Sequence, residues 1–558
     1  MENKKIARTL RLLSQLMELH NENPFKIKSL AAAAFKIDKL PFQAAFKTLP
    51  ELETIEGLGK STAQKVWELL HTGSIPELAE YLDKTPAGVV EILQLKGVGP
   101  KKVQVIWQDL GIENVGELYY ACNENRLKDA KGFGLKTQEE ILKIIDFKMA
   151  SSGRFLYAQA EESGEKLLSA LQSLFPSGKI SFTGDFRRKC EVIDHIDILI
   201  GSSQEIKAED LAKIPEVTAV ESVEDVNKID LFSGIKAQII RCEENDFAYQ
   251  LVVTTGNAEH VAELKKRLNN CSSFDTETEV YAKAGLPFIE PELREGLFEF
   301  EKAEQNLLPK LVVWEDIKGT LHNHSTWSDG VHSLQEMAKY CRDNLNLEYL
   351  GISDHSKSAF YAKGLSEERI AEQHKEIDEL NLTLAPFRIF KGIESDILND
   401  GSLDYVDNVL ATFDFVVASI HSNFKMSEEK ATARLIKAIE NPFTTILGHA
   451  TGRMLLTRNG YPIDYKKVID ACAANKVAIE INSNPLRLDL DWRWHQYAIN
   501  KSIMLSINPD AHRTEGFHDM RFGILAARKG GVEALNCLNT FGLKQIENFF
   551  ELKKPSNL

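Results

Sequence analysis

Cysteine is scarce in this sequence, and the cysteines that occur are not paired along the chain. The 558 residues include seven cysteines, scattered singly and never arranged as C-x-x-C. A secreted fold held by disulfides uses closely spaced cysteines as a framework, and no such framework is present. We therefore expect reduced thiols and a cytoplasmic protein.

Long apolar runs are also missing. No stretch approaches the ~20 consecutive apolar residues that a transmembrane helix needs. The first residues include Lys4, Lys5 and Arg8 but no uninterrupted apolar stretch, so they do not match a signal peptide. We expect no association with a membrane.

The composition that remains is that of a globular protein with several domains. Hydrophobic residues make up 43% and charged residues 27% of the chain, and at roughly 100–200 residues per domain the length predicts three to five domains. The net charge of −15 is uneven: residues 1–150 are nearly neutral, and most of the negative charge lies in residues 151–310. Such an acidic segment is a poor general surface for a polyanion.

Three similar glycine-containing segments recur in the first 150 residues, which otherwise show the apolar spacing of helices. Their G-x-G pairs are Gly57 and Gly59, Gly97 and Gly99, and Gly132 and Gly134. Each pair opens an amphipathic run, which indicates an internal repeat. Glycine permits a tight turn, and the N–H groups that open the following helix can face a phosphate.

Lysines next to these glycines add positive charge where a phosphate would lie; they are Lys60, Lys101, Lys102 and Lys136. Together with the glycines they predict a region that binds nucleic acid largely without sequence preference. The alternative is that all three segments are helix caps with a structural role only.

The remaining chain mixes strands and helices. In the acidic segment we expect strands at 179–182, 196–200, 235–240 and 251–253, with helices at 164–174 and 258–268. In the last third, seven apolar runs alternate with helical segments, at 319–321, 349–353, 388–392, 415–420, 445–447, 477–481 and 503–507. Alternating β and α units predict parallel strands, here a barrel slightly short of eight strands.

Histidines and carboxylates follow these strands at the points where the strands end. They are His322, His324, Asp329, His355, Glu394, His421, His449, Asp510 and His512. Parallel strands deliver their carboxyl ends to one face, so these nine side chains should meet there. Nine ligands are too many for one ion, and two or three clustered divalent ions form a hydrolytic site for phosphate esters.

The motifs H-x-H, S-D-G, D-H, G-x-E-x-D, S-x-H, G-H-x-x-G-R and D-A-H resemble the PHP (polymerase and histidinol phosphatase) domain. All nine positions that match the metal ligands of that domain are intact. The resemblance implies a distorted seven-stranded barrel with two or three ions of the Mn²⁺ or Zn²⁺ type. Arg453, after His449, is a candidate phosphate contact, and a surface or helix-capping role is the alternative.

The glycine segments resemble helix-hairpin-helix motifs, and the domain order resembles bacterial X-family DNA polymerases over nearly the whole chain. The resemblance implies a helical DNA-end-binding domain with the first hairpin (1–85), further hairpins (86–150), an α+β nucleotidyltransferase palm and thumb (151–306), and a (β/α)7 PHP barrel (315–558). It implies gapped, nicked or 3′-ended DNA as the partner and a role in DNA repair. The sequence identifies no protein partner.

The middle domain departs from that family's pattern, which is Gly-Ser, two arginines, a D-x-D pair and a third aspartate on a neighbouring strand. Gly184, Arg187 and Arg188 match the nucleotide-binding positions, but Asp185 replaces the serine. A carboxylate at that position would repel a triphosphate.

The carboxylates of this site are also mostly gone. The D-x-D pair reads His195-x-Asp197, and the third position is Gln238. Because Mg²⁺ requires charged oxygen ligands, we expect no effective Mg²⁺ site. This predicts a degenerate polymerase module in which Asp197 is the surviving catalytic carboxylate.

Three hypotheses follow from the sequence. The leading one is a DNA-repair enzyme whose working site is the PHP barrel, acting as a metal-dependent 3′–5′ exonuclease or phosphoesterase. The second is a working gap-filling polymerase with shifted ligands and an attached nuclease. The third is a DNA-end-binding scaffold without catalysis.

Overall fold

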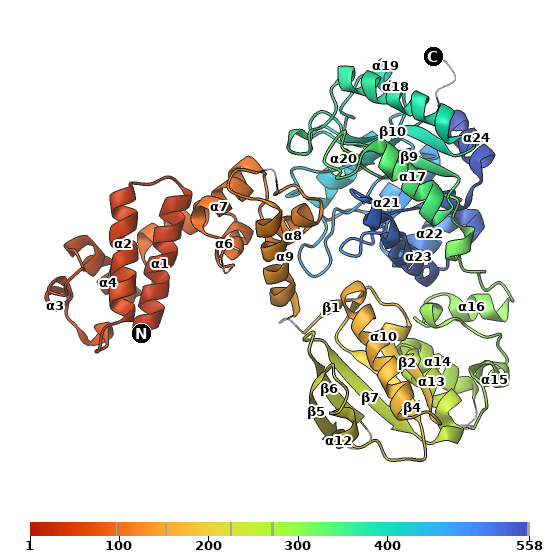
Figure 1. The fold of residues 1–558 in the computed structure, drawn as a ribbon, viewed down its shortest axis with the longest axis horizontal. Helices are drawn as coiled ribbons and strands as arrows, with labels where there is room; N and C mark the ends of the chain where they lie inside the picture. Colours follow the sequence, from red (N-terminus) through yellow and green to blue (C-terminus); the bar gives the residue numbers. More distant parts are fainter. Residues whose placement is uncertain (96, 129, 151–152, 224–225, 269–272, 555–558) are drawn as a thin grey trace. The chain divides into compact units, whose positions relative to one another are not determined.

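The structure, a computed structural model, describes residues 1–95, 97–128, 130–150, 153–223, 226–268 and 273–554. The chain divides into two compact units, Met1–Phe147 and Lys148–Leu558 (Figure 1). Within the described residues, no helix combines the length and the apolar character that a membrane span requires.

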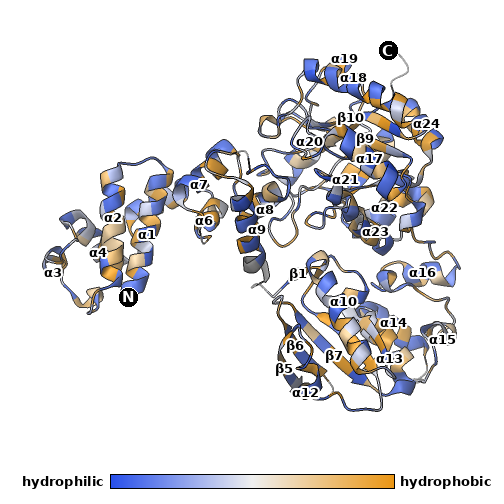
Figure 2. Ribbon diagram, viewed as in Figure 1, coloured by the Kyte–Doolittle hydropathy of each residue, from blue (hydrophilic) through white to orange (hydrophobic). Residues whose placement is uncertain are grey.

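The first unit consists of helices joined by short turns. They are α1 (Asn3–Leu19), α2 (Pro24–Asp38), α3 (Leu49–Glu53), α4 (Lys60–Thr72), α5 (Pro76–Lys84), α6 (Ala87–Leu93), α7 (Pro100–Gln104), α8 (Val115–Asn123) and α9 (Leu135–Ala150). Helix α1 separates hydrophobic from hydrophilic residues around its axis (Figure 2). Ile6, Leu10 and Leu13 are fully buried, as their helical spacing predicts.

The second unit begins with a mixed five-stranded sheet in the order β2-β4-β7-β6-β5. Its strands are β2 (Lys179–Thr183), β4 (Ile196–Gly201), β5 (Val217–Val223), β6 (Val226–Leu231) and β7 (Lys236–Cys242), and a short ribbon pairs β1 (Phe155–Leu156) with β3 (Val192–Ile193). The helices of this domain are α10 (Tyr157–Leu174), α11 (Gly184–Arg187), α12 (Ala208–Leu211), α13 (Phe247–Thr255), α14 (Ala258–Arg267), α15 (Glu277–Lys283) and α16 (Glu299–Glu304).

One predicted strand of this domain is wrong. Residues 251–253 lie inside helix α13, whose buried residues are Ala248, Leu251, Val252 and Thr255. That spacing is helical, and the short apolar run alone does not distinguish a strand from a buried helix. Strands β5 and β6 were not predicted, and β5 is largely solvent-exposed, so it lacks the apolar signal of a buried strand.

The last part of the second unit is a nearly closed, all-parallel barrel. Its strands are β8 (Gly319–Thr320), β9 (Tyr349–Ile352), β10 (Arg388–Asp396), β11 (Phe415–Ser419), β12 (Ile446–Leu447), β13 (Ala478–Asn482) and β14 (Leu505–Asn508), in sequential order. A bridge between Asn323 and Ala511 joins the first and last strand ends. This confirms the predicted seven-stranded (β/α) barrel.

The barrel's helices are α17 (Leu334–Leu345), α18 (Glu367–Leu384), α19 (Asp407–Leu410), α20 (Glu428–Ile439), α21 (Tyr465–Asn475), α22 (His495–Asn500), α23 (Met520–Lys529) and α24 (Leu543–Lys553). The barrel interior is filled by apolar side chains, among them Phe390 and Phe415. Phe550 of α24 stacks on Phe415 with ring centroids 5.2 Å apart. A filled interior leaves the ends of the strands as the place for chemistry.

A buried cation joins the sheet domain to the barrel. Lys529, at the end of α23, is 1% exposed, and its ammonium donates to the Glu295 carboxylate and, at 3.2 Å, to the Arg188 carbonyl. The Arg188 Nε also donates to Glu295, at 2.9 Å. Next to this cluster, Arg528 donates to Glu292 at 2.8 Å. Glu295 thus connects two cations from different domains of one compact unit.

Replacing Lys529 by methionine should destabilise the second unit, because Glu295 would keep its buried charge and lose one of its two cations. Breaking such a buried pair costs about 3–5 kcal/mol. Denaturant unfolding should show a lower midpoint for Lys529→Met. The matched change Lys501→Met, at a lysine whose side chain is 42% exposed, should cost about 1 kcal/mol or less. Equal midpoints for the two variants would contradict this role of Lys529.

Candidate metal centre

All nine predicted ligands lie together at the carboxyl ends of the barrel strands. His322 and His324 follow β8, His355 follows β9, and Glu394 lies near the end of β10. His421 follows β11, His449 follows β12, and Asp510 and His512 follow β14. Asp329 and His421 are half-buried and the other seven are buried. The strands are largely buried, and these polar residues lie at or beyond their carboxyl ends, where the chain leaves the core.

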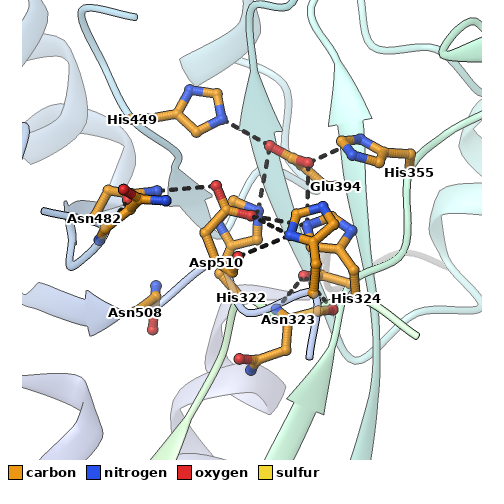
Figure 3. A network of polar contacts seen from close by, with 12 residues as sticks. His322, Asn323, His324, His355, Glu394, His449, Asn482, Asn508 and Asp510 are labelled. Atoms are coloured by element: carbon orange, nitrogen blue, oxygen red, sulfur yellow. Dashed lines mark hydrogen bonds and ion pairs between the residues drawn. The ribbon is translucent and has the colours of Figure 1, made fainter. Parts of the chain in front are cut away.

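Glu394 is at the centre of the cluster (Figure 3). Its carboxylate lies 2.9 Å from His449 Nε2, 3.1 Å from His421 Nε2, 3.3 Å from His322 Nε2 and 3.0 Å from His355 Nδ1. Asp510 Oδ1 lies 3.0 Å from His324 Nε2. One carboxylate therefore reaches histidines from four other strand ends.

Eight of the nine predicted ligands fall into three overlapping groups, and the ligand atoms of each group lie within 4.8 Å of one another; the ninth, His449, contacts Glu394. The groups are His324, Asp329, His355 and His512; His322, His324 and Asp510; and His355, Glu394 and His421. Shared members such as His324 and His355 link the groups, as expected of ions bound close together. Divalent ions therefore fit this arrangement of imidazoles and carboxylates.

Unsatisfied buried atoms support the same fit. His322 Nε2, His355 Nε2 and Glu394 Oε2 are buried and make no hydrogen bond to any described residue. Buried polar atoms are normally satisfied, so atoms left open at one point indicate a ligand. A bound metal ion would satisfy all three atoms, because each of them can offer a lone pair to it.

The histidines of the cluster differ in their pKa because their neighbours differ. Burial, reinforced by His512 and His355 nearby, lowers the pKa of His324 to about 3, so its imidazole is neutral. Burial alone would raise the pKa of Glu394, but His421, His322 and His355 hold that pKa well below its usual range. Burial lowers the pKa of His322 and His421, but Glu480 and Asp510 raise that of His322 well above its usual value, and Glu394 and Asp396 raise that of His421 to about 10. Because divalent ions bind neutral imidazole, metal binding would release protons from these two rings.

A fully buried glutamate supports the cluster and was missed in the sequence. Glu480, in β13, accepts from His322 Nδ1 at 2.6 Å and from the His449 backbone N–H at 2.7 Å. A hydrogen bond to Nδ1 fixes the tautomer, so that Nε2 of His322 faces the cluster with its lone pair. The signal in the sequence was a single charged residue within the apolar run 477–481.

Two buried aspartates, Asp396 and Asp354, also hold residues of the cluster in place. Asp396 contacts His421 Nδ1 and accepts from Ser358 Oγ at 2.9 Å. Asp354 is buried and accepts from the backbone N–H groups of Ser325 and Ser328, at 2.8 and 3.1 Å. Asp354 thereby fixes the loop between His324 and Asp329.

Arg453 lies beside the cluster, but its guanidinium is held by other groups. Its Nε donates to the Arg487 carbonyl at 2.8 Å, and its Nη atoms donate to Asp491 and to the Leu488 carbonyl. These bonds anchor the loop before α22 and leave Arg453 little capacity to bind a phosphate.

The polymerase-like positions of the sheet domain are arranged differently from a two-metal site. Asp197 of β4 pairs in register with Gln238 of β7, as the sequence predicted, and its Oδ1 lies 3.0 Å from His195 Nε2. Among the described residues, no group of three metal-ligating side chains forms around Asp197. Gly184 has φ +59° and lies so close that a Cβ would be 2.2 Å from Asp197 Oδ2.

The two arginines of this domain are bound internally. Arg187 Nη1 donates to Glu277 at 2.8 Å and to Thr255 Oγ1 at 2.9 Å. Arg188 contacts Asp185 and donates to Glu295 at 2.9 Å. These carboxylates occupy the donors that a triphosphate would need.

The predicted nucleic-acid-binding glycines occupy equivalent positions in three turns of the first unit. The leading glycine of each pair has positive φ: +91° at Gly57, +84° at Gly97 and +85° at Gly132. Only glycine adopts such angles without strain. The second glycine of each pair directly precedes a helix, α4, α7 or α9. Lys60, Lys101 and Lys136 are exposed, and Lys102 is half-buried with its ammonium 5.9 Å from the Phe133 ring centroid.

Replacing Glu480 by alanine should weaken metal binding about 10–100-fold, because His322 and the His449 backbone lose their acceptor. Glu480→Gln keeps an oxygen acceptor and should lose less. The measurement is metal retained after dialysis against a chelator, with the exposed Glu440→Ala as control. Equal metal content in Glu480→Ala and the control would contradict the positioning role.

Comparison with known proteins agrees with this architecture. Residues 1–75 match the model of a helix-hairpin-helix domain, and residues 89–145 match that of a SAM-like helix-hairpin-helix tandem. A probable phosphatase of Caldanaerobacter subterraneus is 37% identical over 100 residues, 17% of this chain and 37% of that protein. A probable phosphatase of Vibrio atlanticus is 28% identical over 211 residues, 35% of this chain and 79% of that protein.

A protein of Bacillus subtilis named DNA polymerase/3′-5′ exonuclease PolX matches the whole chain. The two are 34% identical over 576 aligned positions, which cover 99% of this chain and 100% of that protein. The chain therefore belongs to the family of X-family DNA polymerases that carry helix-hairpin-helix motifs and a C-terminal PHP barrel.

Proposed function

We propose that this protein is a DNA-repair enzyme whose barrel hydrolyses phosphodiester bonds at DNA 3′ ends. The observation that carries the proposal is the set of nine ligand side chains around Glu394 at the carboxyl ends of the barrel strands. The name of the B. subtilis relative includes a 3′-5′ exonuclease, which supports this choice among phosphoester hydrolyses.

The residues of the cluster favour particular ions. Six of the nine ligands are imidazoles, which suit Mn²⁺ or Zn²⁺ better than Mg²⁺. Two or three such ions, when bound, polarise a phosphoryl oxygen and lower the pKa of bound water. Glu394 would help to hold an ion together with His355 and His421, while Glu480 and Asp396 hold His322 and His421 in the tautomers that present Nε2.

The rim of the cluster carries groups suited to an unpaired 3′ end. Phe360 is 78% exposed, and the neighbouring Tyr361 ring lies 6.4 Å from that of the ligand His355. Lys357 and Lys363 flank these two aromatics. Unstacked bases bind exposed aromatic rings, and lysines contact the backbone between them, which favours a single-stranded end as the substrate.

The first unit is proposed to bind the DNA through its three hairpins. The family match indicates DNA binding, and the open backbone at Gly97 and Gly132 with lysines nearby suits phosphate contacts, while at Gly57 the Lys36 side chain lies 3.3 Å from the position of a Cβ. Gapped or nicked duplexes and 3′ ends are the proposed targets, without marked sequence preference.

The sheet domain is proposed to be a polymerase module with little or no activity. Asp197 has one histidine and one amide beside it where the family has carboxylates, and Arg187 and Arg188 are bound by Glu277 and Glu295. A working gap-filling polymerase remains the second candidate, because the full-length match is to a protein named as a polymerase.

Replacing both His322 and His324 by alanine should abolish metal binding and lower nuclease activity more than about 100-fold, because ligands of two metal groups are lost. The assay is Mn²⁺-dependent release of nucleotides from a single-stranded 3′ end. His518→Ala, an exposed histidine of the same barrel, and Asp197→Ala should both retain wild-type rates. Wild-type rates in the double variant would falsify the barrel as the nuclease, and a wild-type protein without any nuclease activity would favour the scaffold hypothesis.

Template-directed primer extension by the unmodified protein should be absent or very weak, because the charge that develops on the transferred phosphoryl group lacks bound metal. The triple change Asp185→Ser, His195→Asp and Gln238→Asp should increase extension, since it restores two carboxylates and releases Arg188 from Asp185. Extension assays on a gapped template measure both. Robust extension by the unmodified protein that is lost in Asp197→Ala would establish the gap-filling polymerase instead.

A further inference from the structure

The first unit contains a groove that is not lined by any of the hairpin lysines described above. One wall is helix α1, which contributes Arg8, Arg11 and Gln15, and the other wall is formed by residues 93–95 and 97–99 at the second hairpin. Arg8, Arg11 and Gln15 lie at helical spacings of three and four and so share one face of α1. The other face of α1, with Ile6, Leu10 and Leu13, is buried in the core, which fixes the direction of the two arginines.

The two arginines are available for a ligand. Both are exposed, and neither forms an ion pair with a described residue of the chain. The first turn of α1 contains no acidic residue that could compete for them. Two unpaired guanidinium groups on the wall of a groove attract an anion, and arginine binds phosphate oxygens in a bidentate manner.

The opposite wall lets a ligand approach the backbone. At Gly97 and at Gly99, no atom lies within 4 Å of the position that a Cβ would take. Close packing against another part of the protein therefore does not explain why these two positions are glycine. The space faces the groove that the arginines line.

We propose that this groove binds the sugar-phosphate backbone of a DNA strand, with Arg8 and Arg11 contacting neighbouring phosphates. Three helical residues rise about 4.5 Å, which is close to the axial spacing of about 3.4 Å between phosphates of one strand. The long arginine side chains span the difference. This inference rests on the proposed DNA binding by the first unit and adds α1 to the hairpins as part of that site.

The test is binding of the full-length protein to a labelled gapped duplex, measured with a chelator present so that the barrel does not degrade the DNA. The Arg8→Gln/Arg11→Gln variant should bind about ten-fold more weakly or worse near 0.1 M salt, and its salt slope should fall by about 2. Arg8→Lys/Arg11→Lys should restore the salt slope and recover part of the affinity, because it restores the charge but not the bidentate geometry of the guanidinium groups. Circular dichroism should show unchanged helix content in both variants.

The control removes two charges from exposed positions of the same unit outside the groove, as Lys39→Gln/Lys84→Gln. If this control loses as much affinity as the arginine variant, the effect is one of net charge and the groove is not the site. Unchanged affinity and salt slope in the arginine variant also overturn the proposal. A wild-type protein that does not bind the gapped duplex would instead refute the proposed DNA binding as a whole.

Discussion

The buried carboxylate of Glu394 is the interaction on which the barrel's site depends. An ionised carboxylate without partners is prohibitively costly in an apolar interior, and Glu394 is 1% exposed. Four imidazoles from other strand ends offset that cost at distances of 2.9–3.3 Å. The ends of β8, β9, β11 and β12 must therefore meet around β10. Glu480 and Asp396 then fix the far nitrogens of two of these rings, so the geometry is set before any metal binds.

Buried charges of the sheet domain also need partners, and there the partners are other charged side chains of the protein. Arg294 is fully buried and shares Glu277 with Arg187, at 2.7 and 2.6 Å, while Arg188 and Lys529 share Glu295. Each of these cations has a carboxylate partner within the protein, so a triphosphate would have to compete with those carboxylates. The pairing of Arg188 and Lys529 with Glu295 forms part of the structural connection between the sheet domain and the barrel. An amide at Gln238 is compatible with a stable fold, because these pairs do not include it.

The meeting of the nine side chains at one end of the barrel could be predicted from the sequence, because it follows from the topology of the strands. Any side chain that directly follows a buried parallel strand reaches the same face, so ligand residues could be placed without knowing their contacts. Glu480 escaped because it lies inside a strand and touches ligands rather than the cluster's centre. The strand predicted at residues 251–253 was wrong, and β5 was missed, for local reasons. A three-residue apolar run has no recognisable period, and an exposed strand has no apolar pattern. The groove beside α1 depends on packing between helices far apart in sequence, which no local pattern encodes.

The distribution of charge explains how one acidic chain can act on DNA. Most of the net charge of −15 lies in residues 151–310. Arg187, Arg188 and Arg294 of that segment are paired with buried carboxylates and are not exposed on its surface. Its surface therefore repels a polyanion more strongly than a count of its arginines suggests. In the proposed arrangement the affinity comes from the nearly neutral first unit, through the lysines at its hairpin turns and through Arg8 and Arg11 within helix α1. Binding and hydrolysis then occupy different units, and the sheet domain between them in sequence contributes structure rather than attraction.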